Sequence, residues 1–440
     1  MVKLKQIKLN CKKMLSLKEP KGTRDWFPEE LNIRRAIFSA WRRVCRRYGF
    51  EEYLSPLVES ADVYRAKSGE DVGGKELLSF QDLGGRELAI RPEMTPSVTR
   101  MVSKIYHSAA KPIKYFSIAN FMRNERPQRG RNREFWQLNC DIFGSDSRRA
   151  DLEVMQLALD LVLEFKPPKN SFSLALNSRN LLNQMLSLAG ADKLSEESKM
   201  IVVRTLDKWQ KIKKEEILIR LKETGLKSVG IEIIKKFMDS SSLADLAEKI
   251  PSLKDSLGFA ELDEVLIKLK QLGYQDFVEF NPAIIRGFDY YSGIVFEMFD
   301  KHPANNRAMF GGGRYNGLAE IFGEKNFPAV GFAPGDETFR LFLESWNILP
   351  TVNCFDKLYF LPLLDKELDR ETLVLADLLR REGKNVFMGL DVQKMSKALD
   401  FADKKNVDMV IIFAQAEKEK GEYKIKNMAT GEEIIKKFII

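Results

Sequence analysis

The sequence predicts an α+β protein with an antiparallel sheet, a helical insertion and a small C-terminal α/β domain. Strand-like segments flank a basic connection in the first half, Lys, Glu, Leu and Ile recur at helical spacing over about 193–270, and strands alternate with helices after 350. A chain of 440 residues is also too long for one ordinary core. We therefore expect a basic N-terminal extension (1–17), a main domain (18–350) that carries the insertion, and a second domain (351–440).

The elements of the main domain follow from local patterns. Residues 29–48 carry apolar residues at helical spacing after a proline and two glutamates, as the start of a helix prefers. Residues 87–91 predict a short strand, and Thr95 is the expected N-cap of a helix that continues through about Tyr106. Strands at 115–119 and 135–143 precede a periodic helix at 151–165.

Beyond Leu349-Pro350 the pattern alternates. It predicts a strand (357–363), a helix (371–382), a strand (385–388), a helix (392–404) and a strand (409–413). Alternating strands and helices imply a mainly parallel sheet.

Composition excludes several classes of protein. Residues of the hydrophobic class make up 44% of the chain, yet no stretch approaches the roughly 20 apolar residues that a membrane helix needs, so we expect no membrane partner. Two histidines, His107 and His302, are too few for a zinc hydrolase or a Ser-His-Asp enzyme. Four cysteines contain no CxxC pair, so we expect reduced thiols and no protein-bound zinc. Catalysis would depend on carboxylates, arginines and bound metal.

Charge and the N-terminus suggest partners and location. A net charge of +8 favours a polyanionic partner, although many basic proteins bind no nucleic acid. Lysines interrupt every apolar run of residues 1–17, so a secretory signal is not expected and we predict a cytoplasmic protein. An organelle transit peptide is the alternative, but such peptides favour Arg over Lys.

One segment imitates a phosphate-binding loop. Residues 69–76 nearly fit the pattern GxxxxGK followed by Ser or Thr. Glu76 stands where the metal-ligating hydroxyl belongs and would repel phosphate, so we reject this interpretation.

The most unusual segment runs from Phe121 to Phe135. Five arginines lie within its fifteen residues: Arg123, Arg126, Arg129, Arg131 and Arg133. In an extended chain the last three share one face and offer donors to phosphate oxygens. The alternative is a solvated basic loop.

This segment resembles motif 2 of the class II aminoacyl-tRNA synthetases in its histidyl-tRNA synthetase form. Four further segments resemble that family in the same order: Lys21–Asp25, Arg91–Thr95, Arg286–Tyr291 and Gly312–Leu318. The resemblance begins near Leu17 and includes a tail similar to an anticodon-binding domain. It implies the class II fold, histidine, ATP with Mg²⁺ and tRNA(His) as partners, and a homodimer with residues 55–57 near its interface.

The resemblance also implies roles for individual residues. Arg123 and Arg286 would stabilise charge during adenylation, and the ATP set would be Arg123, Glu125, Arg131 and Glu337. The histidine set would be Glu93, Met94, Thr95, Arg123, Gln137, Asp141, Arg286, Tyr290 and Tyr291. From the residues alone, Glu125 and Arg131 could form a surface ion pair, Tyr290 and Tyr291 could be core, and Gly311–Gly313 could be a tight turn.

One departure separates the chain from the family pattern. Motif 3 usually ends Gly-x-Glu-Arg, but Thr338 stands where that arginine is expected to hold ATP. On a helix, Arg340 points about 200° away from position 338 and is no obvious substitute. A catalytically silent histidine sensor, similar to the regulatory subunit of ATP phosphoribosyltransferase, is therefore one alternative. A class II synthetase for another amino acid and a simple RNA-binding protein are the others.

Overall fold

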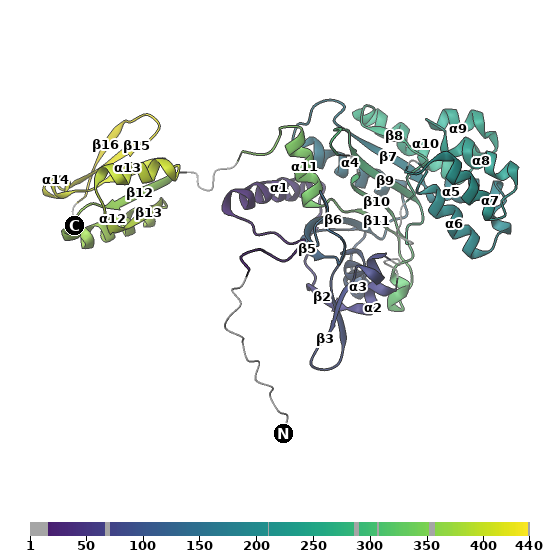
Figure 1. Ribbon diagram of the computed structural model, residues 1–440, viewed down its shortest axis with the longest axis horizontal. Coiled ribbons are helices and arrows are strands. Elements are labelled where there is room, and N and C mark those ends of the chain that lie inside the picture. The colour runs from purple at the N-terminus through teal and green to yellow at the C-terminus, as the bar shows by residue number, and fades with distance from the viewer. Residues whose placement is uncertain are drawn as a thin grey trace, which may run out of the picture. The chain divides into compact units, whose positions relative to one another are not determined.

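The computed structural model describes residues 16–66, 71–209, 211–285, 290–305, 308–351 and 357–438 (Figure 1). The chain divides into two compact units, 1–350 and 351–440. Each unit has its own sheet and its own core.

An eight-stranded sheet forms the centre of the first unit. Its order is β1-β5-β6-β11-β10-β9-β7-β8, and only the outer pairs β1–β5 and β7–β8 are parallel. The antiparallel sheet that the sequence predicts is thus confirmed, with a parallel strand added at each edge. The strands are β1 (Glu51–Glu52), β5 (Ile113–Met122), β6 (Glu134–Phe143), β7 (Phe172–Ser178), β8 (Val278–Phe280), β9 (Ile294–Asp300), β10 (Ala308–Arg314) and β11 (Ala329–Phe332).

The helices that pack on this sheet include α1 (Pro28–Arg47), α4 (Arg148–Leu163) and α11 (Asp336–Ser345). The predicted helix at 29–48 is confirmed as α1. Proline and two acidic residues begin it, and Ile37, Trp41 and Val44 fall on one buried face at helical spacing. Fully burying each such side chain contributes about 1.5–3 kcal/mol, so packing rather than helix propensity holds α1 in place.

A smaller sheet, β2-β4-β3, lies beside the N-terminal part of the main sheet. Its strands are β2 (Val58–Ser60), β3 (Leu78–Gln81) and β4 (Glu87–Ile90), and its helices are α2 (Ala61–Arg65) and α3 (Thr95–Ile105). The N-cap of α3 is Met94 rather than Thr95, because Pro96 takes the second helical position. The hairpin of β3 and β4 carries the exposed side chains of Phe80 and Leu83.

Six helices gather next to β7 and β8 (Figure 1). They are α5 (Arg179–Leu188), α6 (Glu196–Leu206), α7 (Lys214–Glu223), α8 (Ser228–Met238), α9 (Leu243–Lys249) and α10 (Leu257–Leu269). Helices α5 and α10 come into backbone contact at Gly258, where an added Cβ would lie 2.1 Å from the amide nitrogen of Leu181. Short 3₁₀ or π turns cover Asp71–Lys75, Ala191–Lys193, Pro251–Leu253, Lys270–Tyr274 and Ala319–Phe322.

The second unit contains a five-stranded sheet of order β13-β12-β14-β15-β16. Its elements are β12 (Leu358–Leu363), a 3₁₀ turn (Lys366–Leu368), α12 (Asp369–Arg381), β13 (Asn385–Val392), α13 (Met395–Lys404), β14 (Met409–Ile412), α14 (Gln415–Glu419), β15 (Glu422–Asn427) and β16 (Glu433–Lys437). Strands β13, β12 and β14 are parallel, but β15 and β16 add an antiparallel hairpin. The three predicted strands are parallel, as expected, and the antiparallel hairpin, which was not predicted from the sequence, forms where Gly431, with a φ of 75°, reverses the chain after β15.

Within the described ranges, none of the helices combines the length and the apolar character that crossing a bilayer requires. Cys45 and Cys140 are buried free thiols whose sulfur atoms lie 3.4 Å apart. Burial raises the pKa of the Cys140 thiol well above its ordinary value, so this thiol is protonated and belongs to the core.

Candidate active site

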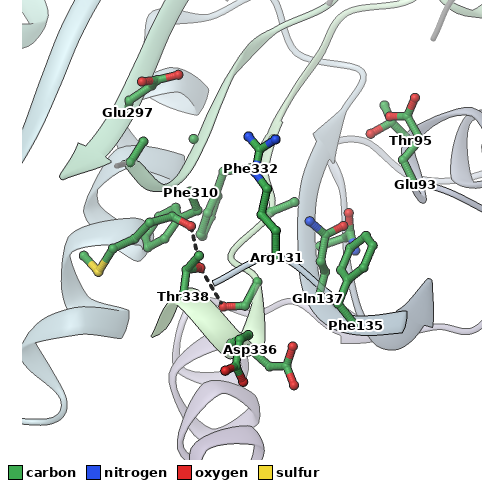
Figure 2. A pocket seen from close by; sticks show the side chains of 18 of the residues that line it. Glu93, Thr95, Arg131, Phe135, Gln137, Glu297, Phe310, Phe332, Asp336 and Thr338 are labelled. Atoms are coloured by element: carbon green, nitrogen blue, oxygen red, sulfur yellow. Dashed lines mark hydrogen bonds between the residues drawn. The ribbon is translucent and has the colours of Figure 1, made fainter. Parts of the chain in front are cut away.

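A cavity of about 280 Å³ opens in the first unit above the middle of the main sheet (Figure 2). Strand β6 forms its floor, and the start of α3, the β5–β6 loop, strands β9 to β11 and the start of α11 form its walls. It brings together Glu93, Thr95, Arg123, Glu125, Gln137, Asp141, Tyr290, Tyr291, Arg131 and Glu337, all of which the resemblance implies for histidine or ATP.

Alternate residues of β6 face the cavity. Phe135, Gln137, Asn139 and Asp141 all line it, because side chains of a strand point to one face at every second position. Asn139 was not among the predicted residues, although the same period of two connects Gln137 to Asp141. Its side-chain nitrogen is buried and has no hydrogen-bond partner among the described residues.

Asp141 is a buried carboxyl group at one end of the cavity. The hydroxyl of Tyr315 donates to Asp141 Oδ1 over 2.5 Å. Burial raises the pKa of Asp141 to about 7, while the hydrogen bond from Tyr315 opposes that rise. Burial also raises the pKa of Tyr315 well above its ordinary value, so its hydroxyl remains a donor. Asp141 can therefore accept a further hydrogen bond from a ligand.

Glu93 and the tyrosine pair lie near this end. The hydroxyl of Tyr290 donates to Glu93 Oε2 over 3.2 Å, and both residues are buried. The rings of Tyr290 and Tyr291 have centroids 5.0 Å apart. The interpretations of these tyrosines as core residues and as site residues both apply, since Tyr290 packs in a hydrophobic cluster and both residues line the cavity.

Glycines bring backbone close to this end of the cavity. Gly311–Gly313 lie inside β10 and not in a tight turn, so the turn interpretation is wrong. A Cβ on Gly312 would lie 2.3 Å from the carbonyl oxygen of Gly331, and a Cβ on Gly331 would lie 2.0 Å from Asp141 Oδ1. The strands can pack at this distance only with glycine at these positions.

The β5–β6 loop carries the arginines to the opposite end. Gln128 and Arg131 exchange backbone hydrogen bonds of 3.0 and 2.8 Å around Gly130, whose φ is 76°. This turn overrides the predicted single face of Arg129, Arg131 and Arg133. Arg131 lines the cavity and lies 3.4 Å from Glu125 Oε2, so it combines a site position with the surface ion pair that was the alternative.

Arg123 is the better-anchored arginine of this end. Its Nε donates to the carbonyl oxygen of Pro92 over 2.9 Å, and its guanidinium carbon lies 5.1 Å from the centre of the Phe135 ring. The remaining guanidinium nitrogens are oriented by these two contacts. Arg286, the other predicted catalytic arginine, lies outside the described residues.

The start of α11 closes the arginine end. Glu337 lines the cavity and pairs with Arg340 over 2.9 Å, so Arg340 is held by its own helix rather than in the cavity. The hydroxyl of Thr338 donates to the carbonyl oxygens of Met309 (2.8 Å) and Gly335 (3.1 Å). Thr338 is thus a small, hydrogen-bonded part of the wall.

Met94 was predicted to bind histidine, but it does not line the cavity. Its side chain is buried in a hydrophobic cluster with Val98 and Phe121, and its sulfur accepts a hydrogen bond from Ser55 over 3.2 Å. Other lining residues were not predicted: Asn132, Phe135, Asn139, Glu297, Phe310, Tyr315, Phe332 and Asp336. Asn132, Phe135 and Tyr315 lie inside the segments that resemble the family, so their position next to predicted site residues could have identified them.

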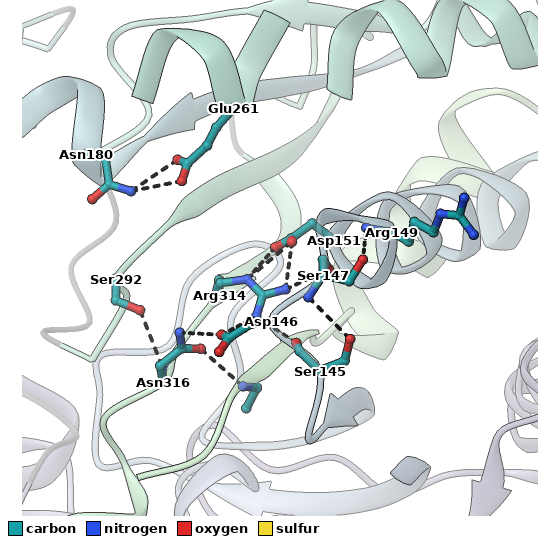
Figure 3. A network of polar contacts seen from close by, with 11 residues as sticks. Ser145, Asp146, Ser147, Arg149, Asp151, Asn180, Glu261, Ser292, Arg314 and Asn316 are labelled. Atoms are coloured by element: carbon teal, nitrogen blue, oxygen red, sulfur yellow. Dashed lines mark hydrogen bonds and ion pairs between the residues drawn. The ribbon is translucent and has the colours of Figure 1, made fainter. Parts of the chain in front are cut away.

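A buried polar network supports the Asp141 end (Figure 3). Arg314 Nη2 lies 2.6 Å from Asp151 Oδ2 and also donates to the carbonyl oxygen of Ser147. Nε donates to Asp151 Oδ1, and Nη1 donates to the carbonyl oxygen of Ser145. The backbone carbonyl of Arg314 accepts from the amide of Ser292 over 2.9 Å. Arg314 therefore anchors the end of β10, which carries Tyr315, to the segment that follows Tyr291.

A second cavity of about 830 Å³ adjoins the first. The two share Gly130, Arg131, Glu297, Ala308, Met309 and Thr338. Its further lining comes from the α6–α7 connection, with Asp207 and Lys211, and from residues 281–285. The arginine end of the first cavity thus continues toward the helical region.

Among the described residues, no group of three or more His, Cys, Asp or Glu side chains could hold a metal ion. Single carboxylates, including Glu297 and Glu337, line the first cavity. The described part of the site therefore offers single carboxylates rather than a complete metal cage.

Comparison with protein families gives one match that spans the site. The family model described as histidyl-tRNA synthetase matches residues 22–336. Among curated proteins, the histidine–tRNA ligase of Leptospira biflexa is 40% identical over 417 residues, which is 94% of each chain. The histidine–tRNA ligase of Pyrococcus horikoshii is 36% identical over 418 residues, 94% of this chain and 95% of that protein.

Solved structures agree in fold. The histidyl-tRNA synthetase of Nostoc sp. PCC 7120 matches with a TM-score of 0.76 and 21% identity over 96% of this chain and 97% of that one. A protein of Bacillus halodurans titled ATP phosphoribosyltransferase regulatory subunit/histidyl-tRNA synthetase matches with a TM-score of 0.71 and 21% identity, covering 90% and 98%. At this identity the two likenesses concern the fold alone.

Proposed function

The chain belongs to the histidyl-tRNA synthetase family and is an ATP-dependent ligase that joins histidine to tRNA; we propose that the 280 Å³ cavity is its adenylation site. The observation that carries this proposal is the polarity of that one cavity. Buried carboxyl groups, Glu93 and Asp141, lie toward one end, and the guanidinium group of Arg131 lies toward the other. Arg123 lines the same cavity and is held at the carbonyl oxygen of Pro92, next to Glu93. Histidine presents a cation and an imidazole, and ATP presents phosphates, so the two ends match the two substrates.

In adenylation, a carboxylate oxygen of histidine attacks the α-phosphorus of ATP. The bond from that phosphorus to the β-bridging oxygen breaks, and pyrophosphate leaves with the bonding electrons. Negative charge accumulates in the transition state, and a fixed cation stabilises it without reorganisation. Arg123, oriented by Pro92 and Phe135, is the described residue proposed for this role, with Arg286 proposed as its counterpart. No nucleophilic side chain is required.

Histidine selection would use the buried end. Glu93, with Thr95 and Gln137, supplies acceptors for the ammonium group. Asp141, fixed by Tyr315, accepts from an imidazole N–H, and Tyr291 packs beside it. A site that hydrogen-bonds its substrate rejects analogues that leave such buried groups unpaired.

ATP would occupy the arginine end, between Phe135 and the residues Glu125, Arg131 and Glu337. One or two carboxylates of the cavity are enough for a Mg²⁺ ion that arrives with the nucleotide, because Mg²⁺ retains phosphate and water ligands. Glu297 and Glu337 are the residues proposed to contact it. When bound, Mg²⁺ supplies charge neutralisation for the pyrophosphate leaving group.

The second half-reaction brings the 3′ end of tRNA to the adenylate. The adjoining 830 Å³ cavity, with Arg129, Arg131 and Lys211, is the proposed entrance. The unit at 351–440 is proposed to bind the anticodon.

A homodimer interface is proposed near residues 55–57. Exposed apolar side chains nearby support it: Leu54, Leu57, Phe80 and Leu83. The proposed location of the protein is the cytoplasm.

The test is exchange of labelled pyrophosphate into ATP, measured with each of the twenty amino acids. We expect exchange with histidine alone and loss of exchange in Arg286→Ala. Thr338, which replaces the expected arginine, favours a second candidate, a histidine sensor without ligase activity. Histidine binding without any exchange would support that sensor and reject the adenylation site.

A further inference from the structure

A buried ion pair connects α1 to α11 beside the arginine end of the cavity. Arg34 Nη2 lies 2.6 Å from Asp336 Oδ2, and the two residues are 8% and 4% exposed. Arg34 does not line the cavity, whereas Asp336 does. The pair therefore stands behind the wall of the site.

The second oxygen of Asp336 connects the pair to β6. Asp336 Oδ1 accepts the backbone N–H of Trp136 over 3.0 Å. Gly335, the residue before it, forms an isolated bridge with Gln137. One carboxylate thus holds α1, α11 and the start of β6 together.

Two tryptophans fix Arg34 in turn. Its guanidinium carbon lies 3.3 Å from the centre of the Trp26 ring and 5.8 Å from that of Trp136. Burial lowers the pKa of Arg34 and raises the pKa of Asp336, while each partner opposes the shift of the other. Each charge is therefore tolerated because the other is in place.

Stability alone does not account for this pair. A buried ion pair is often no more stable than an apolar pair of similar volume, because desolvation offsets the attraction. An apolar side chain at position 336 could not accept the N–H of Trp136, however. Trp136 lies between Phe135 and Gln137, whose side chains face the cavity, so this hydrogen bond sets their position relative to α11.

We propose that Arg34 and Asp336 are positioning residues for ATP binding and adenylate formation, which hold the start of β6 at a fixed distance from the start of α11. The distance between Phe135 on β6 and the residues Glu337 and Thr338 on α11 then stays fixed, and with it the width of the nucleotide end. The proposal rests on the proposed function of the cavity. Misplacing a substrate by about 1 Å can reduce a rate by about 100-fold, so a loosened wall has a measurable cost.

The first variant is Arg34→Met, which removes the guanidinium outside the cavity. We expect the KM for ATP in histidine-dependent exchange to rise about tenfold, with kcat per titrated active site also reduced. The dissociation constant of histidine should stay within about twofold, because Glu93 and Asp141 are held by other contacts. Arg34→Lys retains the charge and should recover part of the loss.

Two further variants separate positioning from stability. Arg43→Met removes another ion pair of α1, to Glu164 at 2.6 Å, and should behave as wild type. The double variant Arg34→Met/Asp336→Asn contains no unpaired charge, but no guanidinium orients its amide group, so the hydrogen bond to the Trp136 N–H is no longer fixed. We expect it to recover the Tm that Arg34→Met loses but to keep the raised KM for ATP.

Folded Arg34→Met with an unchanged KM for ATP would overturn the proposal, as would a double variant that recovers both Tm and kinetics. Calorimetric binding of a non-hydrolysable ATP analogue, without histidine, provides an independent measure. If wild type failed to exchange with histidine, the proposed function would fall, whereas the ratio of analogue dissociation constants for wild type and Arg34→Met would still test the pair.

Discussion

The two ends of the cavity differ in how their charges are held. At the histidine end, Glu93 and Asp141 are buried and accept hydrogen bonds from Tyr290 and Tyr315, respectively. At the nucleotide end, the Arg131 side chain is 55% exposed and extends from a loop that turns at Gly130. At the first end, polar groups are fixed and desolvated, which costs folding free energy. The second end places an exposed cation, Arg131, where solvent still screens it.

This difference teaches which task each end can perform. Rejecting a near-identical amino acid requires buried partners whose loss is costly, because water cannot replace them. Neutralising phosphates requires charge more than shape, apart from one well-oriented group at the reacting phosphorus. We therefore expect substitutions to act on different kinetic constants at the two ends.

Arg123→Ala should have the largest effect, since Arg123 is the anchored cation of the nucleotide end within the part of the chain that the structure describes. We expect kcat/KM for pyrophosphate exchange to fall about 1,000-fold, as when a preorganised transition-state donor is removed. Arg123→Lys should recover only part, because lysine lacks the fork of donors. A loss below about tenfold with an unchanged circular dichroism spectrum would remove Arg123 from its proposed role.

Asp141→Asn should be the strongest change at the histidine end. We expect the kcat/KM for histidine to fall about 100-fold, which corresponds to losing a charged hydrogen bond in a buried site. The KM for ATP should stay within about threefold, because the ends are held independently. Equal rises in both KM values would contradict the division between the two ends.

A pH profile sharpens the same point. The pKa of Asp141 is raised to about 7, so the carboxylate is ionised above that pH and protonated below it. Histidine affinity should therefore decrease about tenfold from pH 8 to pH 6 through this group, since the ionised fraction changes by that factor. Dividing wild-type values by those of Asp141→Asn removes the titration of the substrate imidazole. A flat ratio would show that the charge of Asp141 is not used.

Asn139→Ala tests a residue of the floor that sequence reasoning missed. Its buried side-chain nitrogen lacks a partner among the described residues, so a substrate acceptor would satisfy it. We expect a rise in KM of about tenfold for histidine, with Tm unchanged or higher. Asn139→Ser retains a donor, so its KM for histidine should lie between the values of wild type and Asn139→Ala. A histidine KM equal to that of wild type would assign Asn139 to the scaffold.

Arg131→Ala should have the smallest effect, because solvent screens this exposed cation. We expect a rise in the KM for ATP of about threefold to fivefold, which diminishes as salt is added. Titration of the exchange rate with potassium chloride provides the measurement. A larger, salt-independent loss would mean that the loop closes over ATP and buries Arg131.

Period and motif predicted strands β4, β5, β6, β12, β13 and β14 and several residues of the floor. Gln137 and Asp141 came from the family pattern, and the alternation along β6 could also have identified Asn139. The hairpin of β15 and β16 was not predicted, although Tyr423 and Ile425 alternate with lysines as in a half-buried strand. These omissions had a local signal.

Other features had none. The face expected for Arg129, Arg131 and Arg133 assumed an extended chain, and the left-handed conformation of Gly130 breaks it. Met94 stands within a segment that resembles the family, yet packing directs its side chain into the core. The pairing of Arg34 with Asp336 joins residues from opposite ends of the first unit, so only the folded chain reveals it.

The small side chain at position 338 has a consequence for inhibitor chemistry. Thr338 forms part of the boundary between the two cavities, where the family pattern has an arginine. An adenylate mimic with a bulky substituent directed past Thr338 would extend into the neighbouring space. We expect such a compound to inhibit this enzyme more strongly than its Thr338→Arg variant, and equal inhibition would show that the boundary is closed. A residue that departs from its family would then become a handle for selective inhibition.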